Sequence, residues 1–309
     1  MLFVIASLIV THLVIPAVFM ISLWRSKFQS KLNWSIALLT LTVYSIHIFL
    51  IGRWDWISYY VRFLLPILFF IVAFQSFIKA KSLPLYPPKK FKNYLDLGIN
   101  VLVTILFLAI LKSYIPQGYL FTGAPVELSF PLKNGTYYVA HGGNNPTINY
   151  HNTYPTQQYA LDLMKLNVLG ARANGFSPQS LIDYAIFGET LYSPCDGTIS
   201  SLINDLPNLV PGKKDRKNPD GNHILLGCKG AQITMAHLLK GSITNQVGSF
   251  VKTGDAIAKI GNSGNTSEPH LHIHAQTANT GKSSLDREGV PITFDGKFLV
   301  RNSVLFLSH

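Results

Sequence analysis

Four long apolar runs fill the first 116 residues of this 309-residue chain. They cover residues 2–24, 34–51, 57–77 and 97–115, and each comes near the roughly 20 residues that a helix needs to cross a ~30 Å hydrocarbon core. Only 13% of the chain is charged and 48% is hydrophobic, whereas about a quarter of a soluble domain is charged. The sequence therefore predicts a four-helix transmembrane region over residues 1–116, and it excludes intrinsic disorder.

The net charge of +11 belongs mainly to loops between these runs. One basic cluster follows the first run and another lies between the third and fourth, whereas the intervening loop offers only Arg53 beside Asp55. The clusters consist of Arg25, Lys27 and Lys31, and of Lys79, Lys81, Lys89, Lys90 and Lys92. Basic residues between apolar runs indicate the topology of a membrane protein and not a nucleic-acid-binding surface. We therefore expect the chain to contact lipid and to bind no nucleic acid.

The charge asymmetry also predicts the orientation of the chain. Basic loops stay in the cytoplasm, and the first run has its basic residues behind it, which is the reverse of a cleavable signal peptide. With both basic loops inside, four spans return the chain to the outer side. We therefore expect a multi-pass protein of the cell membrane whose C-terminal domain lies outside the cytoplasm, in the periplasm or the extracellular space.

The part of the chain after residue 116 has the pattern of a β domain. Residues 117–136 are rich in Gly, Pro and Thr and predict a linker with a first strand, followed by a single domain over residues 137–309. Short apolar or β-branched runs are separated by Gly, Asn, Asp and Pro, which favours a mainly antiparallel β fold. The expected strands include residues 190–192, 197–200, 223–226, 231–236, 250–251, 256–260 and 271–274, with one helix at 178–184.

The clearest chemical signal is the segment Pro269-His-Leu-His-Ile-His274. Alternate side chains of a strand share a face, so His270, His272 and His274 point one way while the apolar residues between them point into the core. Imidazoles at this spacing on a rigid strand can serve a metal ion or a water beside it. Exposed histidines on a sheet surface are the alternative.

Two further residues fit a metal centre of this kind. Asp162 is an acidic residue in the apolar run Tyr159-Ala-Leu-Asp-Leu163, where its burial would be costly without a cation or hydrogen bonds. It could instead cap the following turn. His237 closes the strand pattern Met235-Ala-His-Leu238, and alone it could equally be an ordinary half-buried histidine.

Together these segments resemble the lysostaphin/LytM-type peptidases of the M23 metallopeptidase family, over roughly residues 137–275. The resemblance implies a barrel-sandwich hybrid fold and one zinc ion per domain, with Asp162 and His272 as ligands and His237 and His270 as catalytic residues. His274 matches no essential position of the family. The matching segments are Tyr159-Ala-Leu-Asp162, Ser193-Pro-Cys-Asp-Gly197, Gly221-Asn-His-Ile224, Met235-Ala-His-Leu238, Val247-Gly248 through Gly254-Asp255, and Gly261-Asn-Ser-Gly-Asn-Thr266 to His270-Leu-His272.

The first zinc ligand departs from the family pattern. The family places a histidine four residues before the aspartate, and this chain has Gln158 there, which is a poor zinc ligand. His151, 11 residues before Asp162, is our candidate, provided that the intervening residues fold back as a loop. His141 is the second candidate, and a domain without a first ligand, which would not cleave, is the third.

The resemblance implies a membrane-anchored zinc metalloendopeptidase that hydrolyses peptide bonds of peptidoglycan, in cross-links or stem peptides. The alternative within the family is an inactive LytM-like module that binds the cell wall or regulates another enzyme. Biotinyl or lipoyl carriers share similar hairpins, but they need a lysine at a hairpin tip, and the tip Asn262-Ser-Gly-Asn265 has none. A phosphocarrier domain would be cytoplasmic and would not need Asp162. The oligomeric state and the bond cleaved stay open.

Cys195 and Cys228 are the only cysteines of the chain. Outside the cytoplasm a disulfide between neighbouring strands is permitted, and two free buried thiols are the alternative. The complete set of histidines and aspartate makes zinc ligation by either cysteine unnecessary.

Overall fold

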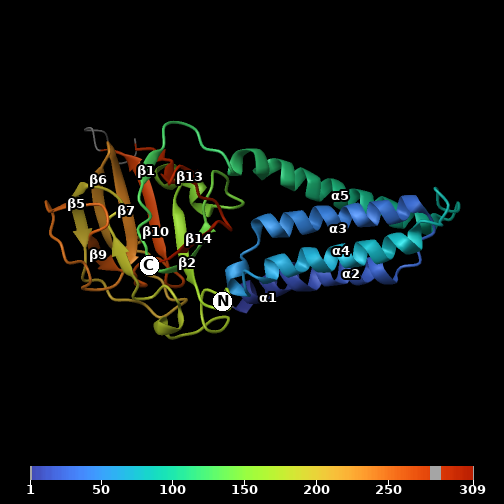
Figure 1. The fold of residues 1–309 in the computed structure, drawn as a ribbon, viewed down its shortest axis with the longest axis horizontal. Helices are drawn as coiled ribbons and strands as arrows, with labels where there is room; N and C mark the ends of the chain where they lie inside the picture. Colours follow the sequence, from blue (N-terminus) through green and yellow to red (C-terminus); the bar gives the residue numbers. More distant parts are fainter. Residues whose placement is uncertain (1, 279–286, 309) are drawn as a thin grey trace. The chain divides into compact units, whose positions relative to one another are not determined.

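The structure is a computed structural model that describes residues 2–278 and 287–308. Its contacts divide the chain into two compact units (Figure 1). One unit is helical and comprises Met1–Trp54 with Ser58–Ile115. The other is a β unit that comprises Asp55–Ile57 with Pro116–His309.

The helical unit contains, within the described residues, four helical segments long and apolar enough to cross a membrane, with mean hydropathies of 1.9 to 2.5. They fit a membrane anchor and correspond to the four predicted runs. The first segment is interrupted by one π-helical turn. The elements are α1 (Leu2–Ile9), the π turn η1 (Val10–Val14), α2 (Ile15–Arg25), α3 (Lys31–Ile51), the 3-10 turn η2 (Trp54–Trp56), α4 (Val61–Ala80) and α5 (Phe91–Gly118).

The fourth segment is longer than the sequence predicts. Helix α5 begins at Phe91, six residues before the expected start at 97, and continues past Pro116 to Gly118. A proline near a helix end removes one backbone hydrogen bond without preventing a last turn, which explains why Pro116 does not itself end the helix.

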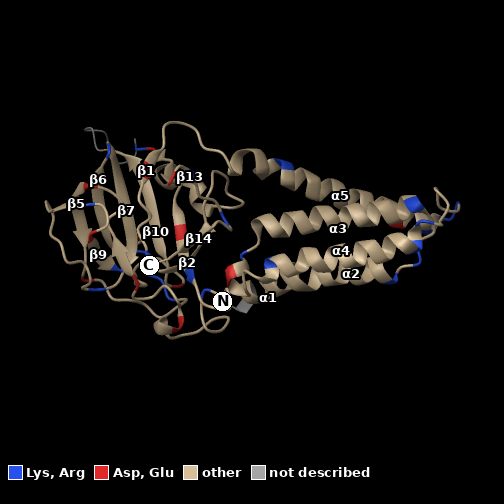
Figure 2. Cartoon of the chain, viewed as in Figure 1, with Lys and Arg blue, Asp and Glu red and all other residues tan. Residues whose placement is uncertain are grey.

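Apolar side chains cover the outside of this bundle and polar ones join its helices. Phe70 and Phe74 of α4 are 68% and 66% exposed, as expected for side chains that face lipid. Between helices, the hydroxyls of Thr40 and Thr104 lie 2.7 Å apart. Lys and Arg gather at the end of the bundle where α2 joins α3 and α4 joins α5 (Figure 2). The two basic clusters therefore share one end of the bundle.

The β unit is mainly antiparallel, which confirms the predicted fold class. Its described residues form a nine-stranded sheet in the order β14-β2-β3-β10-β7-β6-β5-β8 with β11 beside β10, a three-stranded sheet β1-β12-β13 and the pair β4-β9. The only parallel pair among the described strands is β1 with β12. The strands are β1 (Val126–Leu128), β2 (Gly135–His141), β3 (Leu161–Leu166), β4 (Thr190–Tyr192), β5 (Gly197–Ile203), β6 (Asn222–Cys228), β7 (Ala231–Leu238), β8 (Phe250–Val251), β9 (Ala256–Lys259), β10 (Leu271–Thr277), β11 (Gly289–Val290), β12 (Ile292–Phe294), β13 (Lys297–Phe298) and β14 (Val304–Leu307).

The core of this unit lies where the apolar faces of the strands meet. Leu271 and Ile273 of β10 are fully buried in it, together with Leu163 of β3 and Met235 of β7. The predicted alternation along β10 therefore holds for its apolar residues. Since β10 lies between β3 and β7 in the sheet, the polar side chains of these three strands are held on a rigid support.

The predicted helix at residues 178–184 is wrong. The structure has only a 3-10 turn, η5 (Leu181–Asp183), at that place. Tyr184 is drawn into an isolated antiparallel bridge with Ala173, and its hydroxyl donates a hydrogen bond to the carbonyl of Pro178. These contacts hold the end of the segment in an extended conformation. A helix of seven residues is too short to be stable unless tertiary packing supports it.

Cys195 and Cys228 form a disulfide, which decides between the two alternatives that the sequence leaves open. Cys228 ends β6 and Cys195 lies in the turn before β5, so the bond joins the end of β6 to the turn before its neighbour β5, on the side of the core.

Candidate metal centre

Three side chains, from one loop and from two neighbouring strands of the large sheet, converge at one place. His151, Asp162 and His272 are buried, and one potential ligand atom from each lies within 4.8 Å of the others. Nε2 of His151 is 3.0 Å from both carboxylate oxygens of Asp162. Nδ1 of His272 is 3.0 Å from Oδ1 of the same carboxylate. The structure thus brings together two imidazoles and one carboxylate.

Two members of this group are positioned by strand pairing. Asp162 in β3 lies directly opposite His272 in the antiparallel neighbour β10. On its other side β3 pairs with β2, where an extra residue between Val139 and His141 forms a bulge opposite Asp162. Bulges twist a strand locally and often lie next to functional sites. The bulge in β2 lies opposite Asp162, whose carboxylate belongs to the group of three.

The third member, His151, is positioned by a loop. It lies in the 3-10 turn η3 (Tyr150–Thr153), which Asn149 caps by accepting a hydrogen bond from the backbone N–H of His151. The Asn149 amide also donates to the carbonyls of Gly143, Gln158 and Ala160. One fully buried side chain therefore folds the loop back on β3.

His141, the second candidate for this position, and Gln158, which stands at the family's usual place, have other partners. Gln158 follows the 3-10 turn η4 (Pro155–Gln157) and donates a hydrogen bond to Oδ1 of Asn144. Nδ1 of His141 accepts a hydrogen bond from Arg301 at 2.8 Å, and its ring packs against Tyr150. Among the described residues, the group around Asp162 does not include His141.

A second bulge determines the direction of the His237 side chain. Between Asn222 and Ile224 of β6 the pairing with β7 shifts, so that β7 carries an extra residue there. His237 has a left-handed backbone with φ of 63°, which is uncommon for a residue with a side chain and recurs at functional sites. Its Nδ1 is 2.9 Å from the carbonyl oxygen of Ser263. A carbonyl only accepts, so Nδ1 carries the proton and Nε2 has the lone pair.

His270 lies just before β10 and beside His237. Its Nδ1 is 2.8 Å from the carbonyl oxygen of Glu268, and Thr266 donates its hydroxyl proton to the same carbonyl. Nε2 of His270 is therefore the unprotonated nitrogen in the neutral ring, and it lies 3.5 Å from Oδ1 of Asp162. The ring centroids of His237 and His270 are 4.7 Å apart. The two rings form a pair next to the group of three.

A close approach of two glycines joins the loop before β10, which leads to His270, to the loop before β6. Gly264, with φ of 89°, lies so near the backbone of Gly221 that an added Cβ would come within 2.4 Å of the Gly221 nitrogen. At Gly221 an added Cβ would lie 2.3 Å from the carbonyl oxygen of Ser263. Glycine at both positions lets the loop before β10 contact the loop before β6.

Burial and the neighbouring rings shift the pKa values of these groups. Burial alone would raise the pKa of Asp162, but the imidazoles of His151 and His270 outweigh it and hold this pKa well below its usual range. Burial holds the pKa of His237 well below its usual value. For His270, burial has the largest single effect and lowers the pKa, but the Asp162 carboxylate and Glu268 together outweigh it, so that its pKa lies above the usual value.

The group of three has the donor chemistry of a cation site. Nδ1 of His151 is 3.2 Å from the amide oxygen Oε1 of Gln157, which can only accept, so the lone pair of His151 is on Nε2. That nitrogen faces the carboxylate oxygens of Asp162. Opposed lone pairs repel unless a cation or a proton lies between them. Two imidazole nitrogens and one carboxylate oxygen are the ligand set of many catalytic zinc sites, and the residues present fit zinc.

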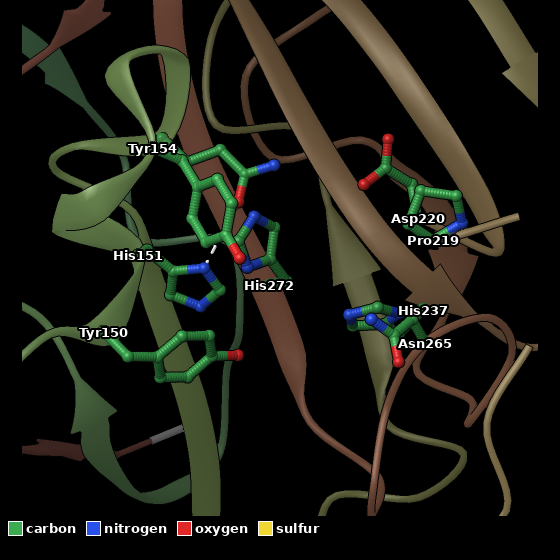
Figure 3. Close-up of a pocket in the computed structure, with 9 residues that line it drawn as sticks. Tyr150, His151, Tyr154, Pro219, Asp220, His237, Asn265 and His272 are labelled. Carbon is green, nitrogen blue, oxygen red and sulfur yellow. Dashed lines mark hydrogen bonds between the residues drawn. The ribbon is translucent and has the colours of Figure 1, made fainter. Parts of the chain in front are cut away.

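The group lies beside a cavity of about 300 Å³. Figure 3 shows Tyr150, His151 and Tyr154 on one side of the cavity and Pro219, Asp220, His237 and Asn265 on the other. No sequence pattern indicates a role for the tyrosines, for Gln157, for Asp220 or for Asn265. Tyr150 adjoins His151 in the sequence and Tyr154 follows three residues later, and this proximity is the only signal that could have found them. The lining residues are Tyr150, His151, Tyr154, Gln157, Pro219, Asp220, His237, Asn265 and His272.

Comparisons with known proteins place the chain in a family context. Residues 178–284 match the model of the family described as Peptidase family M23. No curated protein matches the chain.

Solved structures match the chain at low sequence identity. One is a zinc-containing peptidase from Vibrio cholerae, at 18% identity, over 49% of this chain and 37% of that chain, with a TM-score of 0.30. Another is the catalytic domain of the antimicrobial peptidase lysostaphin from Staphylococcus simulans, at 18% identity, over 50% and 87% of the two chains, with a TM-score of 0.29. A third is the SpoIIQ–SpoIIIAH pore-forming complex, at 13% identity, over 50% and 85%, with a TM-score of 0.31. This chain thus spans little more than a third of the Vibrio chain's length.

Proposed function

We propose that this chain, which contains a peptidase family M23 domain matched over residues 178–284, is a membrane-anchored zinc metalloendopeptidase that hydrolyses peptide bonds of peptidoglycan. The observation that carries the proposal is the convergence of His151, Asp162 and His272 beside a cavity that His237 also lines. A buried donor set next to an open cavity is the arrangement that metal-assisted hydrolysis requires.

In this proposal His151, Asp162 and His272 hold the zinc ion. Zinc bound there would polarise a peptide carbonyl and make a water molecule more acidic. Asp162 contributes the negative charge of the site, and its low pKa keeps it ionised at neutral pH. The strands β3 and β10 fix two of the three ligands, and the capped turn η3 supplies the third.

His237 and His270 are the proposed catalytic residues. In each neutral ring Nδ1 donates to a backbone carbonyl, so Nε2 is the nitrogen that can take up a proton. Nε2 of His237 can accept the proton of an attacking water from the side of the cavity and later donate it to the leaving amine. His270 lies beside His237, and a proton held on its Nε2 can be donated as a hydrogen bond to the developing oxyanion.

Peptidoglycan is the proposed substrate because of the proposed orientation. The two basic clusters lie at one end of the helical bundle, and basic loops are retained in the cytoplasm. An even number of spans then brings the β unit to the outer side. The disulfide between Cys195 and Cys228 supports an oxidising compartment. Cell-wall peptides are the abundant peptide substrates there.

The test uses the full chain purified in detergent. Metal analysis should find about one zinc per chain, and incubation with purified cell-wall sacculi should release new peptide amino termini that mass spectrometry identifies. His237→Ala should retain zinc and release none. A zinc-loaded chain that cleaves no wall peptide would contradict the proposal and would favour the wall-binding or regulatory module. A chain without zinc affinity would contradict it as well.

A further inference from the structure

The buried imidazole of His274 is used by none of the proposed catalytic steps. His274 lies in β10 between the core residues Ile273 and Ala275, and it is only 5% exposed. Its backbone pairs with Thr234 of β7. Burial of a polar ring in a strand is costly unless the ring is hydrogen-bonded. The ring therefore needs a partner that offsets this cost.

The partner is the proposed zinc ligand two residues earlier. Nδ1 of His274 lies 2.9 Å from Nε2 of His272, and the ring centroids are 5.1 Å apart. Residues two apart in a strand share a face, so the contact follows from the position of both residues in β10.

The two nitrogens of His272 thus have different neighbours. Nδ1 faces Asp162 at 3.0 Å, and Nε2 faces His274. A neutral imidazole has one N–H and one lone pair. Only the tautomer with its proton on Nε2 presents the Nδ1 lone pair to the group around Asp162. In that tautomer the Nε2–H must donate to Nδ1 of His274.

We infer that His274 is a positioning residue for the metal centre, which accepts the Nε2–H hydrogen bond of His272 and thereby fixes the tautomer and the ring orientation of that ligand. The inference rests on the proposed function, since it takes His272 to be a zinc ligand. Metal-binding histidines commonly donate their second ring N–H to a carboxylate, a carbonyl or water, and loss of such a partner typically costs 10- to 100-fold in metal affinity. In this chain an imidazole provides the acceptor.

The experiment measures zinc affinity of the full chain in detergent by competition with a chromogenic chelator. His274→Leu and His274→Phe remove the acceptor and keep an apolar side chain of similar size, so the zinc dissociation constant should rise about 10- to 100-fold. His274→Asn is the rescue variant, because its Oδ1 stands one bond beyond Cγ, as Nδ1 does in histidine. Its zinc affinity should lie closer to that of the unaltered chain.

A matched control and a stability measurement separate positioning from packing. His223 of β6 is a half-buried histidine of the same sheet whose Nδ1 bonds to the carbonyl of Gly221, and His223→Leu should leave zinc affinity unchanged. The thermal midpoint of each zinc-free variant reports folding independently of the metal. If His274→Leu does not fold, the comparison of His274→Phe with His274→Asn decides.

The outcomes distinguish this inference from the proposed function. Unchanged zinc affinity in both folded apolar variants would overturn the inference and leave the proposed function standing. Equal losses in His274→Asn and in the apolar variants would also overturn it, since the acceptor would then be irrelevant. An unaltered chain that binds no zinc would overturn the proposed function and this inference together.

Discussion

Asp162 and His272 stand directly opposite each other on the antiparallel strands β3 and β10, with Oδ1 of the carboxylate 3.0 Å from Nδ1 of the ring. The two residues are 110 positions apart in the sequence, and the pairing of β3 with β10 makes them neighbours. Because strand pairing fixes both backbones, this pair is the rigid part of the candidate centre, and His151 reaches it from a loop.

Ligand and catalytic variants should separate in metal content. We expect Asp162→Ala and His272→Ala to lose zinc and peptidase activity together, because each removes a proposed ligand. His237→Ala and His270→Ala should retain most zinc and lose about 10²- to 10⁴-fold in activity, the range typical of general acid–base groups. Metal analysis and a peptide-release assay on the four variants check this. Equal zinc loss in all four would refute the division of roles.

The first ligand can be identified by three parallel variants. His151→Ala leaves zinc with two protein ligands. Loss of a residue that only hydrogen-bonds to a ligand already weakens metal affinity about 10- to 100-fold, so this variant should lose at least as much. Gln158→Ala should have little effect on affinity, since the side chain bonds to Asn144. Chelator competition measures both.

His141→Ala is the control for this series. Its ring bonds to Arg301, so we expect zinc to stay bound. Full zinc occupancy in His151→Ala would mean that the first-ligand assignment is wrong, and zinc loss in His141→Ala with retention in His151→Ala would reverse it.

Asn149 should determine whether the loop carrying His151 keeps its shape. Asn149→Ala removes three donated hydrogen bonds and the cap of η3, and it leaves buried backbone groups unsatisfied at about 1–3 kcal/mol each. We expect a lower thermal midpoint and weaker zinc binding. Asn152→Ala, in the same turn but only partly buried, is the comparison and should cost less on both measures. Equal effects would argue against this role of Asn149.

The disulfide should contribute measurably to the stability of the β unit. Cys195 and Cys228 are 33 residues apart, and closing a loop of this length stabilises a fold by about 3–4 kcal/mol through the unfolded chain. Cys195→Ser with Cys228→Ser should lower the thermal midpoint of the full chain and abolish its sensitivity to reductant. A midpoint that does not change in the double variant would show that the bond contributes nothing.

The orientation of the chain can be tested with fusions after residue 309. A reporter that is active only outside the cytoplasm should work at this position, because both basic loops are expected inside. Moving two lysines from the α4–α5 loop to the loop between α3 and α4 should weaken the preference. A reporter that works only in the cytoplasm would overturn the orientation and the cell-wall substrate with it.

Local pattern was sufficient for much of the fold. The length and apolarity of the four runs predict the helices, since crossing a membrane depends on hydropathy summed along a single helix. The alternation of Leu271 and Ile273 with histidines predicts β10 and its buried face, because side-chain direction in a strand has a period of two residues. The short segment at 178–184 was mispredicted as a helix, since the bridge between Ala173 and Tyr184 is a tertiary contact.

The candidate centre depended on contacts between distant residues. Sequence spacing favoured His151 over His141 without showing which one lies near Asp162, because that depends on how Asn149 folds a loop back on β3. The direction of His237 follows from a bulge between β6 and β7, and bulges have no periodic signal. The pairing of Cys195 with Cys228 and the bond between His272 and His274 likewise needed the structure. The sequence by itself determined which elements form and which residue types they carry, since these depend on neighbours along the chain. Only the tertiary structure decided which side chains meet, because that depends on strand register and loop closure.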